Sequence, residues 1–272
     1  MEPGGKIVWI TGASSGIGRA LALALGAAGA RLILSGRRAD ALQDTVDDLA
    51  AAGNAESLIL PFDTTDLAAL PGIVERAAAW HGGIDILVNN AGISQRSLAI
   101  DTAAEVYDRV IGTDLMAPIH LTQACLPHLT ARDESLVVAI SSVAGRIGVP
   151  LRTAYCAAKH GLIGYMDALR AEAEVAHGLH VLNVLPGSVA TNVASNALTA
   201  AGAPQGHSDP QIDNGMPADE CAARIVDAIR AGTRELIVAR GMEEQMALLR
   251  QSDGEALFGL TAKLGAQIAG AA

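Results

Sequence analysis

Seven short apolar runs recur along the chain, separated by longer stretches in which Ala and Leu recur at helical spacing. The runs are KIVWI, RLILS, SLILP, IDILVNN, LVVAIS, HVLNVLP and ELIVA. Each is almost continuously apolar rather than alternating, which is typical of strands buried on both faces. The alternation of strands and helices predicts a doubly wound α/β fold, with a parallel seven-stranded sheet and helices on both faces. Such folds bind ligands at the carboxyl ends of their strands, so motifs that directly follow a strand are the candidate site.

The length of the chain suits one domain, because α/β folds of 272 residues commonly form a single unit. We therefore predict one domain over residues 1–272. Residues 192–217 lose the strand pattern and gather Gly, Pro, Ser, Asn and Asp, so we expect a substrate lid there. Residues 241–272 are expected to form a helical C-terminal extension.

Charge and cysteine content narrow the class of partner. The formal net charge is −10 with no basic cluster, which argues against binding to nucleic acid or to an anionic membrane and favours a small-molecule partner. Cys125, Cys156 and Cys221 lie far apart without a CxxC motif, so we interpret them as packed residues in a reducing compartment. No signal-peptide pattern and no long apolar span is present. The expected location is cytoplasmic.

A glycine-rich motif, TGASSGIG, follows the first predicted strand and opens a helix. Gly12, Gly16 and Gly18 remove Cβ atoms where the backbone has to approach a ligand, and the helix N-terminus offers free N–H groups to a pyrophosphate. The spacing G-x-x-x-G-x-G departs from the strict G-x-G-x-x-G fingerprint, so the position between strand and helix carries the prediction. The alternative is a tight turn whose glycines serve packing only.

The second strand ends in LILSGRRAD, where a Rossmann-type fold usually carries an acidic residue for the adenosine ribose. Arg37 and Arg38 stand there instead, and their planar guanidinium groups suit a 2′-phosphate, so we predict NADP(H) rather than NAD(H). The alternative is a pair of solvated arginines at a helix start. After the third strand, Asp63 is either an acceptor for the adenine amino group or part of a helix N-cap spanning Asp63 to Asp66.

The segment TAYCAAKHG places Tyr155 and Lys159 one helical turn apart, so that their side chains share a face. A neighbouring ammonium favours the ionised form of a phenol, which makes a tyrosine usable as an acid or base. Ser141 and Ser142 end the preceding strand, where a hydroxyl can bind a substrate oxygen. Taken alone, a Tyr/Lys pair is more often an amphipathic face without chemistry.

Four motifs in order make the chain similar to the short-chain dehydrogenase/reductase superfamily, in its short single-domain branch. TGASSGIG resembles the family's cofactor loop, NNAG its fourth-strand motif, YCAAK its Y-x-x-x-K motif and PGSVAT its nicotinamide-side loop. The resemblance implies that Tyr155 transfers the proton, and that Lys159 binds the nicotinamide ribose and supports the tyrosine. It also implies that Ser142, thirteen residues before the tyrosine, positions the substrate oxygen.

The resemblance also implies the cofactor contacts and one departure from the family. The expected cofactor-binding residues are Gly12, Ser14, Ser15, Gly16, Ile17, Gly18, Arg37, Arg38, Asp63, Thr64, Asn90, Ala91, Gly92, Tyr155, Lys159, Pro186, Gly187, Val189 and Thr191. Where the family usually has an asparagine that supports a proton relay, this chain has Asp114. A carboxylate near Lys159 would keep the ammonium charged but partly cancel its field at the tyrosine, so we expect a higher pH optimum.

These observations favour an NADP(H)-dependent oxidoreductase that acts on a carbonyl or secondary alcohol, of the carbonyl reductase or alcohol dehydrogenase type. The apolar content of the predicted lid indicates an apolar substrate of the lipid or steroid kind. The alternatives are an NAD-dependent polyol dehydrogenase and a dinucleotide-binding regulator without catalysis. The scattered histidines have no metal-ligand spacing, so no metal site is predicted. The family resemblance implies a homo-oligomer, either a dimer or a tetramer.

Overall fold

The computed structural model describes residues 1–53 and 56–270, and its centre is one sheet of seven parallel strands. The last two residues of the predicted 241–272 extension therefore lie outside the described residues. The strands are β1 (Ile7–Thr11), β2 (Arg31–Ser35), β3 (Ser57–Ile59), β4 (Ile86–Asn89), β5 (Ser135–Ile140), β6 (Leu179–Pro186) and β7 (Glu235–Val238). Each coincides with one of the apolar runs, so the predicted seven-stranded α/β fold is confirmed.

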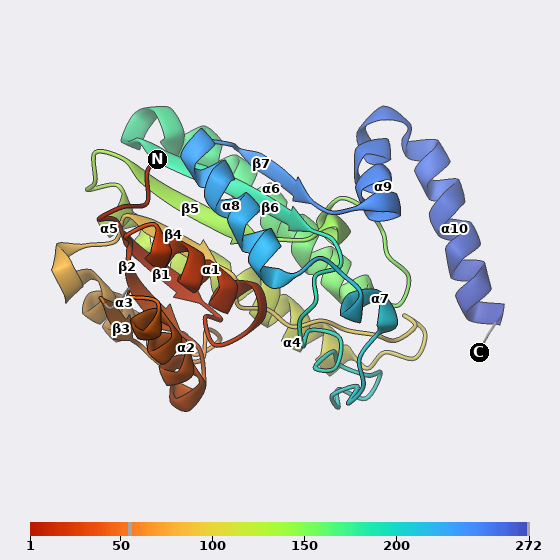
Figure 1. Cartoon of the computed structure of the whole chain (residues 1–272). Coiled ribbons are helices and arrows are strands. Elements are labelled where there is room, and N and C mark those ends of the chain that lie inside the picture. The colour runs from red at the N-terminus through yellow and green to blue at the C-terminus, as the bar shows by residue number, and fades with distance from the viewer. Residues whose placement is uncertain (54–55, 271–272) are drawn as a thin grey trace.

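Helices cover both faces of this sheet (Figure 1). They are α1 (Gly16–Ala27), α2 (Ala39–Ala51), α3 (Leu70–Ala79), α4 (Ala104–Ile111), α5 (Ala117–Leu129), α6 (Thr153–His177), α7 (Pro210–Asp213), α8 (Ala218–Ala231), α9 (Gly241–Ser252) and α10 (Gly254–Gly270). Short 3₁₀ turns lie at Trp80–Gly82 and Val143–Gly145, and one π-helical turn, Gly112–Met116, joins α4 to α5.

Alternate residues of each strand fill two separate cores. In β1, Val8 and Ile10 pack into a core with α1, α2 and α8, whereas Ile7 and Trp9 pack into a core with α3, α5 and α6. Because both faces of the strand are buried, its sequence is continuously apolar, as expected for a parallel sheet. Each buried CH₂ contributes roughly 0.8 kcal/mol to the free energy of unfolding, so both cores stabilise the sheet and the positions of its strand ends.

The strand order, β3-β2-β1-β4-β5-β6-β7, fixes where a ligand binds. After β1 the chain builds outward through β2 and β3, then crosses back to place β4 on the other side of β1. The two directions of winding leave a crevice at the carboxyl ends of β1 and β4, which is the usual ligand site of open α/β sheets. TGASSGIG follows β1 and NNAG includes the end of β4, so both motifs border this crevice.

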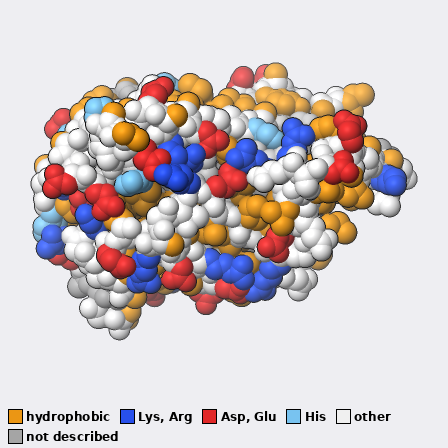
Figure 2. Space-filling model, turned by 90° about the horizontal axis from the view of Figure 1, so that it is seen from above, with side chains coloured by type: hydrophobic (Ala, Val, Ile, Leu, Met, Phe, Trp, Pro, Cys, Tyr) orange, Lys and Arg blue, Asp and Glu red, His pale blue; other side chains and the backbone are white. Residues whose placement is uncertain are grey.

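The last two helices extend the molecule beyond β7, and α9 packs against the end of β7 through the buried Ala247. Figure 1 shows α9 and α10 at one end of the molecule beyond β7, with α10 outermost. Several of their large apolar side chains are exposed, and Figure 2 shows hydrophobic side chains at this end. The exposed residues are Met242, Leu248, Phe258, Leu260 and Leu264. Among the described helices, none is long and apolar enough to cross a bilayer.

Candidate active site

The glycine loop between β1 and α1 is held in a shape that only glycine adopts easily. Gly12 and Gly16 have φ angles of +68° and +54°, and a Cβ atom on Gly18 would overlap the carbonyl oxygen of Gly12. The Asn90 side chain fastens the loop from the β4 side, since its Nδ2 donates to the carbonyl oxygens of Thr11 at 2.8 Å and Gly12 at 3.2 Å. The two motifs predicted to border the cofactor are therefore bonded to each other.

The start of α1 fits a phosphate group. Ser15, the residue before the helix, makes no side-chain capping bond, and the first turn carries no acidic residue. The first N–H groups and the positive end of the helix dipole are thus left for an anion. The loop after β6 reaches the same place, because a Cβ on Gly16 would lie 3.1 Å from Cγ2 of Thr191. Gly16 and Thr191 also border a cavity of ≈ 590 Å³ between α1 and the start of α8.

Arg37 and Arg38 follow β2 and are exposed. Neither guanidinium group makes a hydrogen bond or ion pair to any residue in the described ranges, so both are left for a ligand. Asp63 lies in a turn, where its Oδ1 accepts from the N–H of Thr65 at 2.9 Å and from its hydroxyl at 2.7 Å. The Thr65 N–H lowers the pKa of this carboxyl. Asp63 thus stabilises a local turn and caps no helix, because α3 begins at Leu70 and its N-cap is Ala69. The interpretation as a helix N-cap is wrong at this residue, whereas a contact of Oδ2 with an adenine stays a prediction.

The two serines after β5 have different surroundings. The hydroxyl of Ser141 donates to the carbonyl oxygen of Lys159 at 3.1 Å, so it is used in fixing α6 against the strand. Ser142 Oγ accepts from the N–H of Ala144 at 3.1 Å and donates to the carbonyl oxygen of Pro186 at 3.3 Å. This second serine therefore stands between the ends of β5 and β6, on the ligand edge of the sheet.

Tyr155 and Lys159 lie on α6, as the spacing predicts. Lys159 is 4% exposed, and its Nζ is 5.5 Å from the centre of the Tyr155 ring. Nζ also donates to the carbonyl oxygen of Ile140 at 3.0 Å, which anchors the ammonium to the end of β5. The Tyr155 ring packs among apolar residues that include Leu198, while its hydroxyl makes no hydrogen bond within the described part of the chain. A buried cation therefore lies beside a phenol whose hydroxyl is left for a ligand.

Asp114 completes this group and is fully buried in the π-helical turn. Its Oδ1 accepts from the N–H of Ile93 at 2.8 Å, and its Oδ2 is 3.1 Å from Lys159 Nζ. Burial raises the pKa of Asp114, against the opposing attraction of Lys159. Burial also lowers the pKa of Lys159, but the neighbouring Asp114 and Tyr155 outweigh it, so the net direction is upward. We interpret the two side chains as a charged pair, with Lys159 protonated.

The absence of a side chain at Gly92 leaves room for the Asp114 carboxylate. A Cβ atom at that position would lie 2.8 Å from Asp114 Oδ2, which is closer than side chains normally approach. The π-helical turn adds one residue to the helical circuit between α4 and α5, a device that often occurs at functional sites. The glycine of NNAG and the helix irregularity together bring Asp114 to Lys159.

The predicted lid, residues 192–217, is folded against the body of the protein. Leu198 bridges to Gln95, and its N–H donates to the carbonyl oxygen of Ser94 at 2.8 Å. Arg96 and Asp209 form an ion pair at 2.6 Å. The short helix α7 lies within this segment. Residues 192–217 are thus bonded to the loop after β4, and Leu198 belongs to the apolar cluster against which Tyr155 packs.

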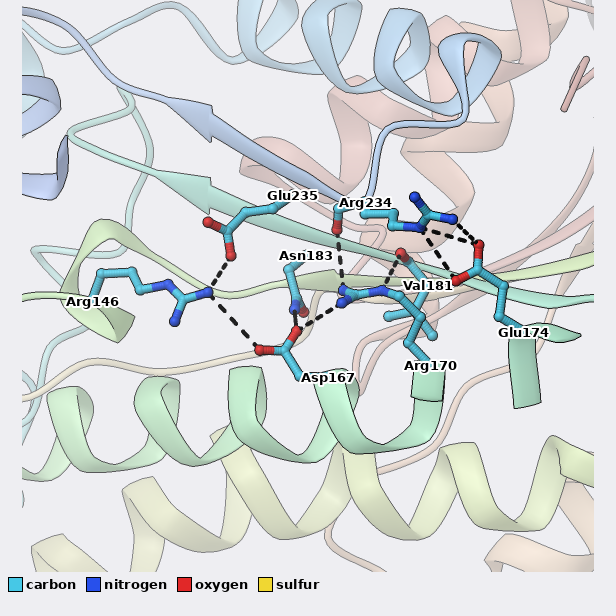
Figure 3. A network of polar contacts seen from close by, with 8 residues as sticks. All are labelled: Arg146, Asp167, Arg170, Glu174, Val181, Asn183, Arg234 and Glu235. Atoms are coloured by element: carbon cyan, nitrogen blue, oxygen red, sulfur yellow. Dashed lines mark hydrogen bonds and ion pairs between the residues drawn. The ribbon is translucent and has the colours of Figure 1, made fainter. Parts of the chain in front are cut away.

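A polar network missed by the sequence analysis ties the serine loop to the far edge of the sheet (Figure 3). Arg146, four residues after Ser142, forms an ion pair with Glu235 of β7 and lies 4.0 Å from Asp167 of α6. Asp167 in turn accepts from Asn183 at 2.9 Å and pairs with Arg170 at 3.0 Å. These residues come from four separate elements, and no local sequence pattern predicts that they meet.

The cysteines and the histidines show no sign of a catalytic or metal-binding role in the described residues. Burial raises the pKa of Cys221 to about 12 and that of Cys125 further, which favours the neutral thiols expected of packed residues. Within residues 1–53 and 56–270, no group of three or more His, Cys, Asp or Glu side chains has the arrangement to hold a metal.

Comparison with known proteins gives a consistent result. The family model described as short chain dehydrogenase matches residues 6–201. "Dehydrogenase/reductase SDR family protein 7-like" of Anopheles gambiae is 40% identical over 239 residues, covering 86% of this chain and 75% of that protein. "Dehydrogenase/reductase SDR family member 7B" of Bos taurus is 38% identical over 249 residues, covering 90% of this chain and 76% of that protein.

Solved structures agree with the fold. A short chain dehydrogenase/reductase from Burkholderia phymatum, crystallised in complex with NAD, has a TM-score of 0.83 at 25% identity and covers 94% of this chain and 96% of its own. An alcohol dehydrogenase from Thermococcus sibiricus, complexed with 5-hydroxy-NADP, has a TM-score of 0.74 at 22% identity, with coverage of 86% and 95%. With the family model and the curated relatives in agreement, this chain belongs to the short-chain dehydrogenase/reductase family of oxidoreductases.

Proposed function

We propose that this protein is an NADP(H)-dependent oxidoreductase that interconverts a carbonyl compound and a secondary alcohol, with Tyr155 as general acid and base. The observation that carries the proposal is the buried Lys159 ammonium, 5.5 Å from the centre of the tyrosine ring, beside a hydroxyl that no described residue binds. A phenol next to a fixed cation gives up and regains a proton more readily than a phenol in water.

A nicotinamide dinucleotide fits the residues at the carboxyl edge of the sheet. The uncapped start of α1 suits the pyrophosphate, and the adjoining loops after β4 and β6 suit the adenosine and nicotinamide ends. Relatives in the comparison are described with NAD and with 5-hydroxy-NADP, which supports a cofactor of this class. When bound, the cofactor supplies or accepts the hydride, which no side chain of this protein can do.

Two arginines favour the phosphorylated form of the cofactor. Arg37 and Arg38 stand after β2, where a carboxylate would repel a 2′-phosphate, and their guanidinium groups have no partner in the described ranges. An unpaired guanidinium at this position forms charge-assisted bonds with a phosphate at little cost, since it has no ion pair to break.

The residues around Tyr155 divide the remaining work. Ser142, held between Ala144 and Pro186, orients the substrate oxygen toward the tyrosine hydroxyl. In the reductive direction the hydroxyl of Tyr155 gives its proton to that oxygen, and in the oxidative direction it takes the proton back. Lys159 stabilises the phenolate, and Asp114 keeps Lys159 protonated while weakening its field at the tyrosine.

The lid supports an apolar substrate. Its buried side chains include Ala197, Leu198 and Met216, and Leu198 packs in the same cluster as Tyr155. An apolar cluster packed against Tyr155 favours a ketone or alcohol with a hydrocarbon body.

A screen of carbonyl compounds tests this proposal. Oxidation of NADPH is followed at cofactor concentrations of about 1 mM or lower. The same assay is run in parallel with NADH, and both cofactors are tested with wild type and with Arg37→Ala. We expect turnover of apolar ketones with NADPH, and a rise of roughly tenfold or more in the KM for NADPH, but not for NADH, in Arg37→Ala. Equal use of both cofactors by wild type and variant would contradict the NADP(H) assignment.

A further inference from the structure

Glu243 lies in the first turn of α9, outside the residues matched by the family model, yet its side chain reaches the loop after β6. Its Oε2 accepts from the backbone N–H of Ser188 at 2.7 Å, and its Oε1 accepts from the Ser188 hydroxyl at 2.7 Å. Oε1 also accepts from Nε2 of Gln211, in α7 of the lid, at 3.0 Å. One carboxylate thus joins three elements that are far apart in the sequence.

The surroundings leave this carboxylate little freedom. A Cβ atom on Gly187 would overlap Glu243 Oε2 and would lie 3.0 Å from the Cβ of Ala239, so the loop passes directly under the side chain. An acidic residue is favoured in the first turn of a helix, where the helix dipole attracts it. Bonds from a backbone N–H and a hydroxyl to a carboxylate are charge-assisted, and they are stronger than bonds between neutral groups.

The loop held in this way is the PGSVAT motif. Ser188 precedes Val189 and Thr191, and the loop is also bonded to the end of the lid, since Met216 donates to the carbonyl oxygen of Ser188 at 2.9 Å and Ala190 donates to that of Met216 at 2.9 Å. Two backbone hydrogen bonds therefore join the loop to the end of the lid. Glu243, from α9, adds a side-chain contact to the same loop and to the lid.

We propose that Glu243 is a positioning residue, which holds the Pro186–Thr191 loop in the shape that binds the nicotinamide end of the cofactor and links that loop to the lid. The inference rests on the proposed function for the identity of the ligand, but the clamp itself is a property of the chain. It makes the first turn of α9 part of the active site through Ser188 and Gln211, the residues to which the Glu243 side chain is bonded.

The neighbouring Glu244 offers a matched control. It lies in the same helical turn and carries the same charge, but it is exposed and its carboxylate makes no hydrogen bond or ion pair to any described residue. A general effect of acidic residues at the start of α9, through the helix dipole or net charge, is expected at both positions. An effect of the clamp is expected at Glu243 alone.

The experiment compares Glu243→Ala, Glu243→Gln and Glu244→Ala in the full chain. Amide hydrogen exchange at Ser188 is measured without cofactor, NADPH affinity by fluorescence titration, and kcat and KM with the best substrate of the screen. We expect Glu243→Ala to speed exchange at Ser188 at least tenfold and to raise the Kd and KM for NADPH by about tenfold. Glu243→Gln, which retains one acceptor oxygen, should be intermediate, and Glu244→Ala should match wild type.

The outcomes separate the two proposals. Wild-type exchange at Ser188 in Glu243→Ala would overturn the clamp, and so would unchanged NADPH affinity in a wild-type background that binds NADPH. Equal effects of Glu243→Ala and Glu244→Ala would overturn it as well. A wild-type protein that binds no NADPH would contradict the proposed function, and the role of Glu243 in cofactor binding with it, whereas the exchange result would still decide whether the clamp exists.

Discussion

Replacing Asp114 by asparagine removes one charge from the buried pair while keeping the size of the side chain. The Asp114 carboxylate is 3.1 Å from Lys159 Nζ, which lies 5.5 Å from the centre of the Tyr155 ring. The carboxylate is therefore no more than about 9 Å from the ring, where a unit charge acts on another by about 1.8 kcal/mol at an effective dielectric constant near 20. That energy corresponds to a factor of about 20 in an equilibrium or rate constant.

The direction of the change follows from the balance of effects on Lys159. In the Asp114→Asn variant Lys159 loses the carboxylate that opposes the effect of burial, so its pKa falls. The limb of the kcat/KM profile that depends on a charged Lys159 should therefore move to lower pH in Asp114→Asn.

Stability has to be measured alongside, because removing one partner of a buried ion pair typically costs about 3–5 kcal/mol. Asp85 provides the matched control. Asp85 directly precedes β4, so it lies at the amino ends of the strands, away from the active site. Its carboxylate accepts from the N–H of Ile7 at 2.8 Å and pairs with Arg132 at 3.1 Å. Asp85→Asn should lower the midpoint of thermal unfolding without moving the pH profile. Superimposable profiles for wild type and Asp114→Asn would refute the reasoning.

Two further predictions concern the glycine loop and the lid. Gly18→Ala places a methyl group on the carbonyl of Gly12, so it should abolish NADPH binding in a fluorescence titration. Gly164→Ala, at an open position of α6, should instead raise the free energy of unfolding by about 0.5–1 kcal/mol, and a loss of binding there would contradict the steric argument. Arg96→Met breaks the pair with Asp209 and should raise the substrate KM severalfold with little change in thermal midpoint, since partly exposed pairs contribute less than about 1 kcal/mol; an unchanged KM would show that the pair does not hold the lid.

The features that sequence alone predicted are those encoded over short distances. A strand buried on both faces needs a continuous apolar run, so all seven strands could be located from the sequence. The glycine loop and the Tyr155–Lys159 pair likewise depend on spacing within one turn or one helix. Asp114 was recognised by its place in a family motif, and the structure brings it to Lys159.

The features that sequence missed depend on contacts between distant elements. Arg146 and Glu235 are separated by 89 residues, and Ser188 and Glu243 by 55, so no periodicity links them. Polar residues on loops and helix starts are common on any surface, and only the packing of β6, β7 and α9 brings these together. The choice between two roles for Asp63 was equally open, because the same carboxylate suits a turn and an adenine.

The most direct test of the account is turnover by Tyr155→Phe measured together with its affinity for NADPH. The substitution removes only the hydroxyl, which no described residue binds, so the fold and the cofactor loops are left intact. The account predicts NADPH affinity close to that of wild type and a loss of about 10²-fold to 10⁴-fold in kcat, the usual contribution of a general acid. A variant that binds NADPH normally and retains the wild-type kcat would contradict it.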